Sequence, residues 1–219
     1  MTTSRIRSLW KMQTVEQILT RGPALKAGDI VISKNGGKAC QVTLEDGKQL
    51  TITLGSPTNT LSAPFGLSQW DAAVVQDRVS LDVHASPEIV QAITALDESI
   101  LKYVEANHKK YFGPSSKVEK VREYFRTTIR SHPEGKFEPL CRTKLSKSRV
   151  KVWNPDKSPG DANSIGAHAQ VALVCQVRSL YFMNKSWGVT LETTNVMLSE
   201  GALECPWALG AEAGEPPEM

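Results

Sequence analysis

Hydrophobic and polar positions alternate along residues 171–198, and this pattern predicts two strands joined by a short polar turn. Both arms mix β-branched, aromatic and polar residues and contain no proline, as is typical of strands. The turn is centred on Asn184-Lys185, so Phe182 and Trp187 are predicted to be cross-strand neighbours beside it. Because no other stretch is as densely apolar and aromatic, we expect the other elements to be arranged around this hairpin.

Three shorter alternating runs precede the hairpin, at residues 29–33, 39–44 and 49–54. Asn35-Gly36 and Asp46-Gly47 separate them, and such dipeptides between alternating runs are strong hairpin signals. The sequence therefore predicts a three-stranded antiparallel meander.

The apolar spacing becomes helical after one further strand, Arg78–His84. Ser86-Pro87 supplies an N-cap followed by proline at the first helical position, and apolar residues then recur at helical spacing. A second amphipathic helix is predicted from Ser116, where Glu119 completes a capping box. We therefore expect a helical pair, residues 87–131, inserted into a mainly β (α+β) antiparallel fold.

A single domain is expected over residues 28–199, between two ends of different character. Residues 1–27 carry no firm pattern, and a flexible arm is expected there, with a docked arm or a mitochondrial presequence as alternatives. Residues 200–219 contain glutamate but no Lys or Arg, and their composition predicts an acidic disordered tail. Such a tail could compete with nucleic acid, recruit protein partners, or simply improve solubility.

Charge is unevenly distributed, although the net charge of the 219 residues is only +3. Residues 105–151 contain 13 Lys and Arg against 5 Asp and Glu, so this segment carries +8 and the rest of the chain −5. A basic segment on a nearly neutral protein indicates a polyanionic partner. The alternative is a well-solvated helix and loop without a partner.

Several protein classes receive no support. The four cysteines form no CxxC pair, and the four histidines are equally scattered, so we expect no metal and no cofactor. With no secretory signal and no apolar run of about 18 residues, we expect a soluble protein of a reducing intracellular compartment, the nucleus or the cytoplasm. Nucleotide-binding and hydrolase motifs are missing from the sequence, so an enzyme is not expected. Asp82 and His84 share a strand face without a third group, which leaves catalysis a minor alternative.

Binding of a single-stranded nucleic acid has more support, because a basic groove with aromatic platforms offers a contact for every phosphate and base. The hairpin face that holds Phe182 and Trp187 is predicted to hold Arg178 as well, with Tyr181 on the opposite face, and the sequence does not decide which face is exposed. A tryptophan in a strand is also commonly part of the core. The expected stacking residues are Trp153, Tyr181, Phe182 and Trp187, and the expected phosphate contacts are Lys136, Arg142, Lys144, Lys147, Arg149, Lys151, Arg178 and Lys185.

Three short motifs resemble a protein family of nucleocytoplasmic large DNA viruses with protist relatives. They are APFGLS at 63–68, RVSLD at 78–82 and WGVT at 187–190. The family is similar to viral single-stranded-DNA-binding proteins with an OB fold, so the resemblance implies an OB-like barrel and a role in viral-type DNA replication or repair. The family tends to have Asn-Gly at the hairpin turn, where this chain has Asn184-Lys185, so a longer turn is an alternative.

The sequence thus favours sequence-tolerant binding of single-stranded DNA, with RNA as a close second. The alternative is a structural or protein-interaction protein without affinity for nucleic acid. A homo-oligomer is compatible with both, and neither involves a membrane.

Overall fold

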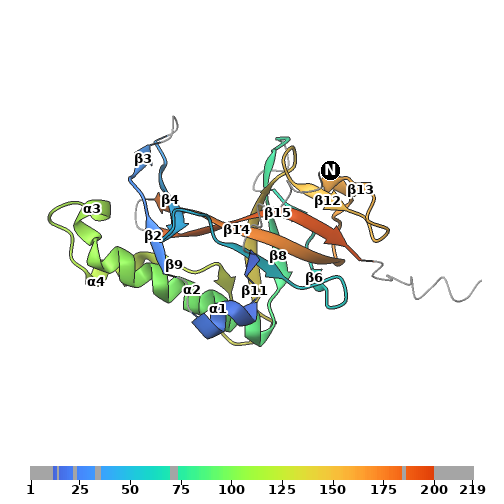
Figure 1. Cartoon of the computed structure of the whole chain (residues 1–219), viewed down its shortest axis with the longest axis horizontal. Helices are drawn as coiled ribbons and strands as arrows, with labels where there is room; N and C mark the ends of the chain where they lie inside the picture. The colour runs from blue at the N-terminus through green and yellow to red at the C-terminus, as the bar shows by residue number, and fades with distance from the viewer. Residues whose placement is uncertain are drawn as a thin grey trace, which may run out of the picture.

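The long hairpin is the spine of the fold in the computed structural model, which describes residues 12–13, 15–21, 24–32, 36–69, 74–183 and 186–199 (Figure 1). Its strands are β14 (Ala169–Met183) and β15 (Ser186–Leu198). Phe182 pairs with Trp187, which confirms the predicted register at the turn. The two turn residues, 184 and 185, lie outside the described residues.

The free edge of β14 is long enough for three short strands in succession. β4 (Lys38–Leu44), β5 (Thr51–Leu54) and β6 (Leu61–Ala63) each pair antiparallel with a different part of it. The predicted meander is therefore half right. β3 (Val31–Ile32) pairs with β4, but β4 and β5 lie one after the other on β14 and not beside each other.

The opposite edge, on β15, is covered by the basic half of the chain. β9 (Phe125–Arg126), β11 (Leu140–Ser146) and β12 (Lys151–Trp153) all run parallel to β15. β8 (Arg78–His84) and β10 (Ile129–Arg130) pair antiparallel with β11. The two-residue strand β7 (Leu67–Ser68) pairs antiparallel with β8, and the two-residue strand β13 (Pro159–Gly160) pairs antiparallel with β12.

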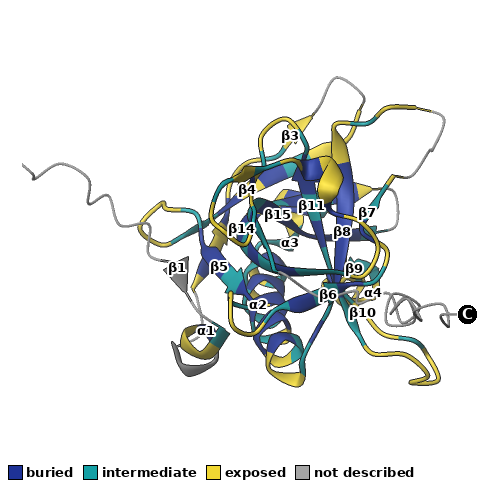
Figure 2. Cartoon of the chain, turned by 90° about the vertical axis from the view of Figure 1, so that its right-hand side faces the viewer, coloured by how far each residue is buried: buried dark blue, intermediate teal, exposed yellow. Residues whose placement is uncertain are grey.

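A tight turn between β6 and β7 closes the ring, because β6 pairs with β14 and β7 with β8. Gly66 in this turn has φ +59°, and a Cβ there would lie 2.5 Å from the carbonyl carbon of Gly166. Only glycine fits both conditions. The result is the expected mainly antiparallel, OB-like barrel, in which much of the strands that form the ring is buried (Figure 2).

Helices cover one end of the barrel. α2 (Pro87–Ala106) starts at Ser86, whose hydroxyl accepts a hydrogen bond from the Ile89 amide, as the sequence predicts. The second predicted helix is much shorter. It consists of α4 alone (Glu119–Tyr124), whose start no side chain caps, whereas α3 (His108–Phe112) is the last turn of the first predicted helix and ends at Gly113. The next residue, Phe125, begins strand β9 and pairs with Trp187 on β15. A 3₁₀ turn, η1, spans Ala162–Ser164.

The N-terminal residues that the structure describes are docked and do not form a flexible arm. β1 (Met12–Gln13) pairs with β5, β2 (Leu25–Ala27) pairs with β4, and α1 (Val15–Arg21) buries Ile18 in the core. Residues 1–11 and the predicted acidic tail, 200–219, lie outside the described residues. None of the helices within the described ranges has the length and apolar composition needed to cross a bilayer.

Candidate nucleic-acid interface

The two faces of the β14–β15 hairpin differ clearly in accessibility. On the inner face Leu173, Val177 and Leu180 are buried in the barrel. On the other side, called the outer face below, β14 presents residues that are all partly exposed: Ala172, Val174, Gln176, Ser179 and Tyr181. This is the distinction that the sequence alone could not make.

Trp187 lies on the inner face, so the prediction that it stacks on a base is wrong. Its exposed fraction is 0%, and its indole Nε1 donates a hydrogen bond to the Val121 carbonyl at 2.7 Å. The rings of Phe112 and Phe125 meet it edge-on. Phe182, 9% exposed, is stacked nearly parallel to it with 6.1 Å between ring centroids. Phe182 is therefore not a platform of the outer face either, although part of it lines a pocket at the hairpin tip.

Arg178 is on the outer face. The prediction that it shares a face with Phe182 and Trp187 is therefore wrong. A β-bulge makes this difference, because Val177 pairs with Leu191 and Ser179 with Thr190, which leaves Arg178 unpaired. Its guanidinium lies 3.4 Å from a carboxylate oxygen of Glu192.

Tyr181 is the aromatic residue of the outer face near the turn. It pairs with Gly188, and a Cβ on Gly188 would lie 2.9 Å from the Tyr181 hydroxyl and 3.1 Å from its ring. The absence of a side chain at residue 188 therefore lets the phenol ring lie across the hairpin. Burial raises the pKa of Tyr181, whereas the nearby charges of Arg126 and Arg130 act to lower it.

Trp153 occupies the other end of the outer face, as the last residue of β12 paired with Met197. It is 36% exposed, and its Nε1 donates to Asn195 Oδ1 at 3.3 Å, which fixes the orientation of the indole. A hollow of about 470 Å³ lies beside it, within the usual range for a small-ligand site. Trp153, Thr53, Gly55, Val174, Asn195 and Met197 are among the residues that line this hollow.

Cationic side chains flank the outer face along β11 and β12. Lys144 is opposite Glu192 in the parallel β11–β15 pair, and Lys151 is opposite Asn195. The Lys144 ammonium donates to Ser80 Oγ at 2.6 Å. Its pKa is lowered by partial burial first, and then by the neighbouring positive charges of Arg142 and Arg78.

The arginines near these lysines are held by two carboxylates. Asp82 is nearly buried and accepts two hydrogen bonds from the Arg142 guanidinium. Glu192 lies 3.3 Å from Arg149 as well as near Arg178. An arginine that is paired with a carboxylate has its guanidinium oriented before a ligand binds. Lys151, by contrast, makes no ion pair within the described part of the chain.

The remaining predicted cations lie elsewhere. Lys136 is in the exposed loop before β11 and pairs with Glu134, and Lys147 follows β11 in the turn to β12. Lys185 lies outside the described residues.

Two arginines that the sequence reasoning placed on a helix are on strands beside the outer face. Arg126 pairs with Gly188, and Arg130 pairs with Leu140 on the edge of β11. The β-branched run at residues 127–129 was the available signal, since such residues favour strands over helices.

Asp82 and His84, the pair behind the minor catalytic alternative, differ in their contacts. Asp82 pairs with Arg142, whereas His84 Nδ1 lies 2.9 Å from a carboxylate oxygen of Glu138, so the two residues of the minor catalytic alternative have separate partners. The described residues contain no group of three or more His, Cys, Asp or Glu that could hold a metal ion.

Comparisons with known proteins find only a distant structural similarity. No protein-family model matches the chain, and no curated protein matches it, so the resemblance to the viral family has no support from them. Among solved structures, the chain is similar to the single-stranded DNA-binding protein from bacteriophage Enc34 in complex with ssDNA, at 13% identity and a TM-score of 0.41, over 82% of this chain and 95% of that chain. A C-terminal truncation of the same phage protein matches at 14% identity and a TM-score of 0.38, over 82% and 93%. At these values the functional argument rests on this chain's own residues.

Proposed function

We propose that this protein binds single-stranded DNA on the outer face of its long hairpin, in a manner tolerant of sequence. The observation that carries the proposal is the composition of this face. Two aromatic side chains, the partly exposed Tyr181 and the exposed Trp153, lie toward its two ends, and cationic residues line its β15 side. Such a protein would cover exposed strands during DNA replication or repair.

The dimensions of the face suit several nucleotides. Tyr181 and Ala172, which is opposite Met197 and hence near Trp153, are nine residues apart on β14, or about 30 Å at the usual rise of a strand. OB folds commonly bind about 4 to 16 nucleotides. A strand lying along the face would stack a base at each end and place its phosphates toward the cations of β10, β11 and β12.

The chemistry favours a single strand over a duplex and gives little reason for sequence readout. Stacking needs an unpaired base whose ring is accessible, and paired bases keep their faces inside the helix. Every base has such a face, and stacking typically contributes about 1–3 kcal/mol for each base. Arginine and lysine contacts to phosphates add affinity that is independent of sequence and weakens with salt.

The proposal is tested by fluorescence anisotropy with oligo-dT, the matching oligo-rU and a duplex of the same length, each at two salt concentrations. We expect tight binding to oligo-dT that weakens with salt, and weak binding to the duplex. Trp153→Ala and Tyr181→Ala should each reduce affinity. Phe137→Ala is the matched control, because Phe137 is an exposed aromatic residue, 69% accessible, in the loop before β11.

Absence of binding, or binding that salt does not weaken, would overturn the proposal. A stable oligomer without nucleic-acid affinity would instead favour the protein-interaction role.

A further inference from the structure

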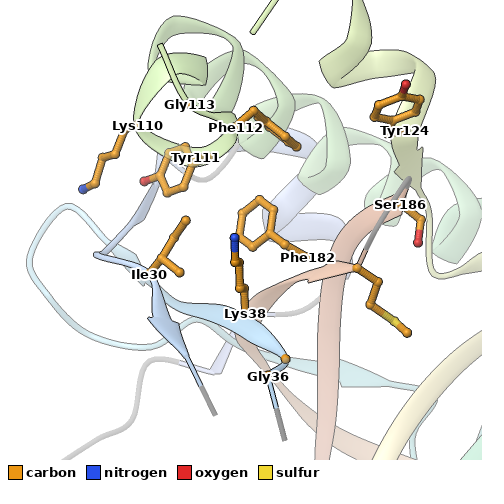
Figure 3. A pocket seen from close by; sticks show the side chains of 12 residues that line it. Ile30, Gly36, Lys38, Lys110, Tyr111, Phe112, Gly113, Tyr124, Phe182 and Ser186 are labelled. Carbon is orange, nitrogen blue, oxygen red and sulfur yellow. The ribbon is translucent and has the colours of Figure 1, made fainter. Parts of the chain in front are cut away.

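A second pocket, called the tip pocket below, lies at the turn end of the hairpin and has a volume of about 750 Å³. It is bounded by α3, by the start of β4, by Tyr124 at the end of α4 and by the hairpin residues next to the turn, at the end of β14 and the start of β15 (Figure 3). Tyr181 and Phe182 are consecutive and point to opposite sides of β14, so the tip pocket is not part of the outer face. The proposed outer-face site leaves it without a role.

The floor of the tip pocket is aromatic and firmly supported. The rings of Tyr111 and Phe182 are stacked with 5.8 Å between centroids and 6° between planes, and Phe112 meets Phe182 edge-on at 5.6 Å. The Tyr111 hydroxyl donates to the Ala27 carbonyl at 2.8 Å, and the buried Trp187 backs Phe182. Because Tyr111 and Trp187 both stack on Phe182, a planar ligand would meet the half-buried Phe112 and the exposed edge of Phe182, and this group needs no rearrangement, which lowers the entropy lost on binding.

The mouth of the tip pocket is positively charged. Lys38 and Lys110 are among its lining residues, and none of the described residues that line it is acidic. Lys110 pairs with Asp29 at 2.8 Å, whereas Lys38 makes no ion pair within the described part of the chain. Figure 3 shows Lys38 extending beside the Phe182 ring, while Lys110 points away from it. Lys38 is thus an available cation next to an aromatic surface.

The side chain of Tyr124 forms the opposite wall of the pocket. Tyr124 stands across the opening from Lys38, with its hydroxyl directed away from the Phe182 ring (Figure 3), and this hydroxyl accepts a hydrogen bond from the Lys120 ammonium at 3.1 Å. A ligand that suits this pocket combines a flat aromatic ring with a negative charge close to the ring. The volume lies within the range of about 300–1,000 Å³ that is usual for small-molecule sites.

We propose that the tip pocket binds one nucleotide, with its base against Phe112 and the edge of Phe182 and its phosphate at Lys38. The choice of a nucleotide among aromatic anions rests on the proposed function. The nucleotide is either the end of a bound strand that has passed the turn beyond Tyr181, or a free mononucleotide. Both sources present the same chemistry to the pocket.

The two sources are separated by two measurements on the full chain. In the first, calorimetry compares dAMP with deoxyadenosine, which lacks the phosphate. In the second, oligo-dT with 5-iododeoxyuridine at one end is photo-crosslinked, and the adducts are mapped by mass spectrometry. For a free mononucleotide, dAMP should bind about tenfold more tightly than deoxyadenosine, as expected for one charged contact. For a strand end, the label should crosslink to Phe112, Tyr124 or Phe182.

Two variants test whether the dAMP binding or the crosslink arises at the tip pocket. If the source is a free mononucleotide, Lys38→Ala should weaken dAMP by about tenfold and leave oligo-dT affinity nearly unchanged. If the source is a strand end, it should reduce crosslinking at the pocket and weaken oligo-dT by at most about tenfold. Phe112→Leu keeps an apolar side chain and should also weaken the pocket. Trp153→Ala is the opposite control, since it should weaken oligo-dT and leave dAMP unaffected.

The failures of the two proposals are distinguishable. If oligo-dT binds through Trp153 while dAMP does not bind and no crosslink falls on the pocket, the tip-pocket inference is overturned and the outer-face proposal stands. If dAMP binds in a manner that requires Lys38 while oligo-dT does not bind, the outer-face proposal is overturned and the tip pocket remains a nucleotide site.

Discussion

Replacement of Trp153 by alanine removes the largest accessible aromatic surface of the outer face without removing a charge. The indole is 36% exposed and borders the hollow beside Met197, so an incoming base can lie against it. Loss of one base–aromatic stack is expected to cost about 1–3 kcal/mol, or roughly 5- to 150-fold in affinity. The cost should fall in the upper half of this range, because the hydrogen bond to Asn195 holds the ring ready.

The assay is anisotropy of labelled oligo-dT across a series of salt concentrations, because the slope separates stacking from charge. A single strand loses about 0.7 in the logarithm of affinity per tenfold rise in salt for each neutralised phosphate. Trp153→Ala should therefore lower affinity at every salt concentration and leave the slope unchanged. Lys151→Gln, two residues earlier on β12, should reduce the slope by about 0.7. Trp153→Phe keeps a ring and should retain most of the affinity.

Two results would refute this reasoning. If Trp153→Ala binds oligo-dT as the unmodified protein does, the outer face does not use this side chain. If instead it changes the salt slope as much as Lys151→Gln, its effect comes from displaced cations and not from stacking. A thermal melt serves as the control for folding.

The remaining predictions concern stability. Trp187→Phe should cost about 2–4 kcal/mol in urea unfolding, because it leaves the Val121 carbonyl unpaired and a void beside it, and a near-neutral result would contradict the buried position. Gly188→Ala should destabilise by about 1–3 kcal/mol and weaken oligo-dT binding, since its Cβ would press on the Arg126 carbonyl and on Tyr181; unchanged binding would mean that Tyr181 is not a platform. Burial raises the pKa of Asp97 to about 7, above its unfolded value, so the folded state holds this proton more tightly and stability should fall as pH rises from about 4 to 7. Asp97→Asn should flatten that dependence in urea titrations at pH 5 and pH 8, and an unaltered profile would assign the dependence to another group.

Local patterns in the sequence predicted the register of the hairpin, but they did not predict which distant strands pair with each other. The alternation around Phe182 and Trp187 determined their pairing, because the period of a strand and the position of the turn leave few alternatives. The pairing of β4 and β5 with β14 followed from the length of β14, which offers one continuous edge, and turn signals do not encode that competition. The early end of the second helix at Tyr124 has a similar cause, since tertiary pairing with β15 outweighs local helical spacing.

The exposed face of the hairpin was harder to predict than its pairing. Both faces carry an aromatic residue near the turn, Tyr181 on one and Phe182 on the other, and composition does not rank them. The bulge then moved Arg178 to the side opposite the one that simple alternation gives. Burial depends on where α2 to α4 pack, and the sequence contained the amphipathic spacing of α2 but not its position against the barrel.

In the proposed binding mode, neighbouring aromatic residues at the hairpin end have different tasks. Phe182 and Trp187 are cross-strand neighbours in the core, and their rings hold the end of the hairpin in place. Tyr181 and Gly188 form the adjacent pair, one step farther from the turn. The packing of Phe182 and Trp187 on the inner face therefore also fixes the backbone of this pair, whose side chain lies on the outer face. A platform held in this way loses little conformational freedom when a base stacks on it, so more of the stacking energy is available as affinity. On the outer face, Phe182 and Trp187 would thus contribute to binding through the position of Tyr181 and not by direct contact.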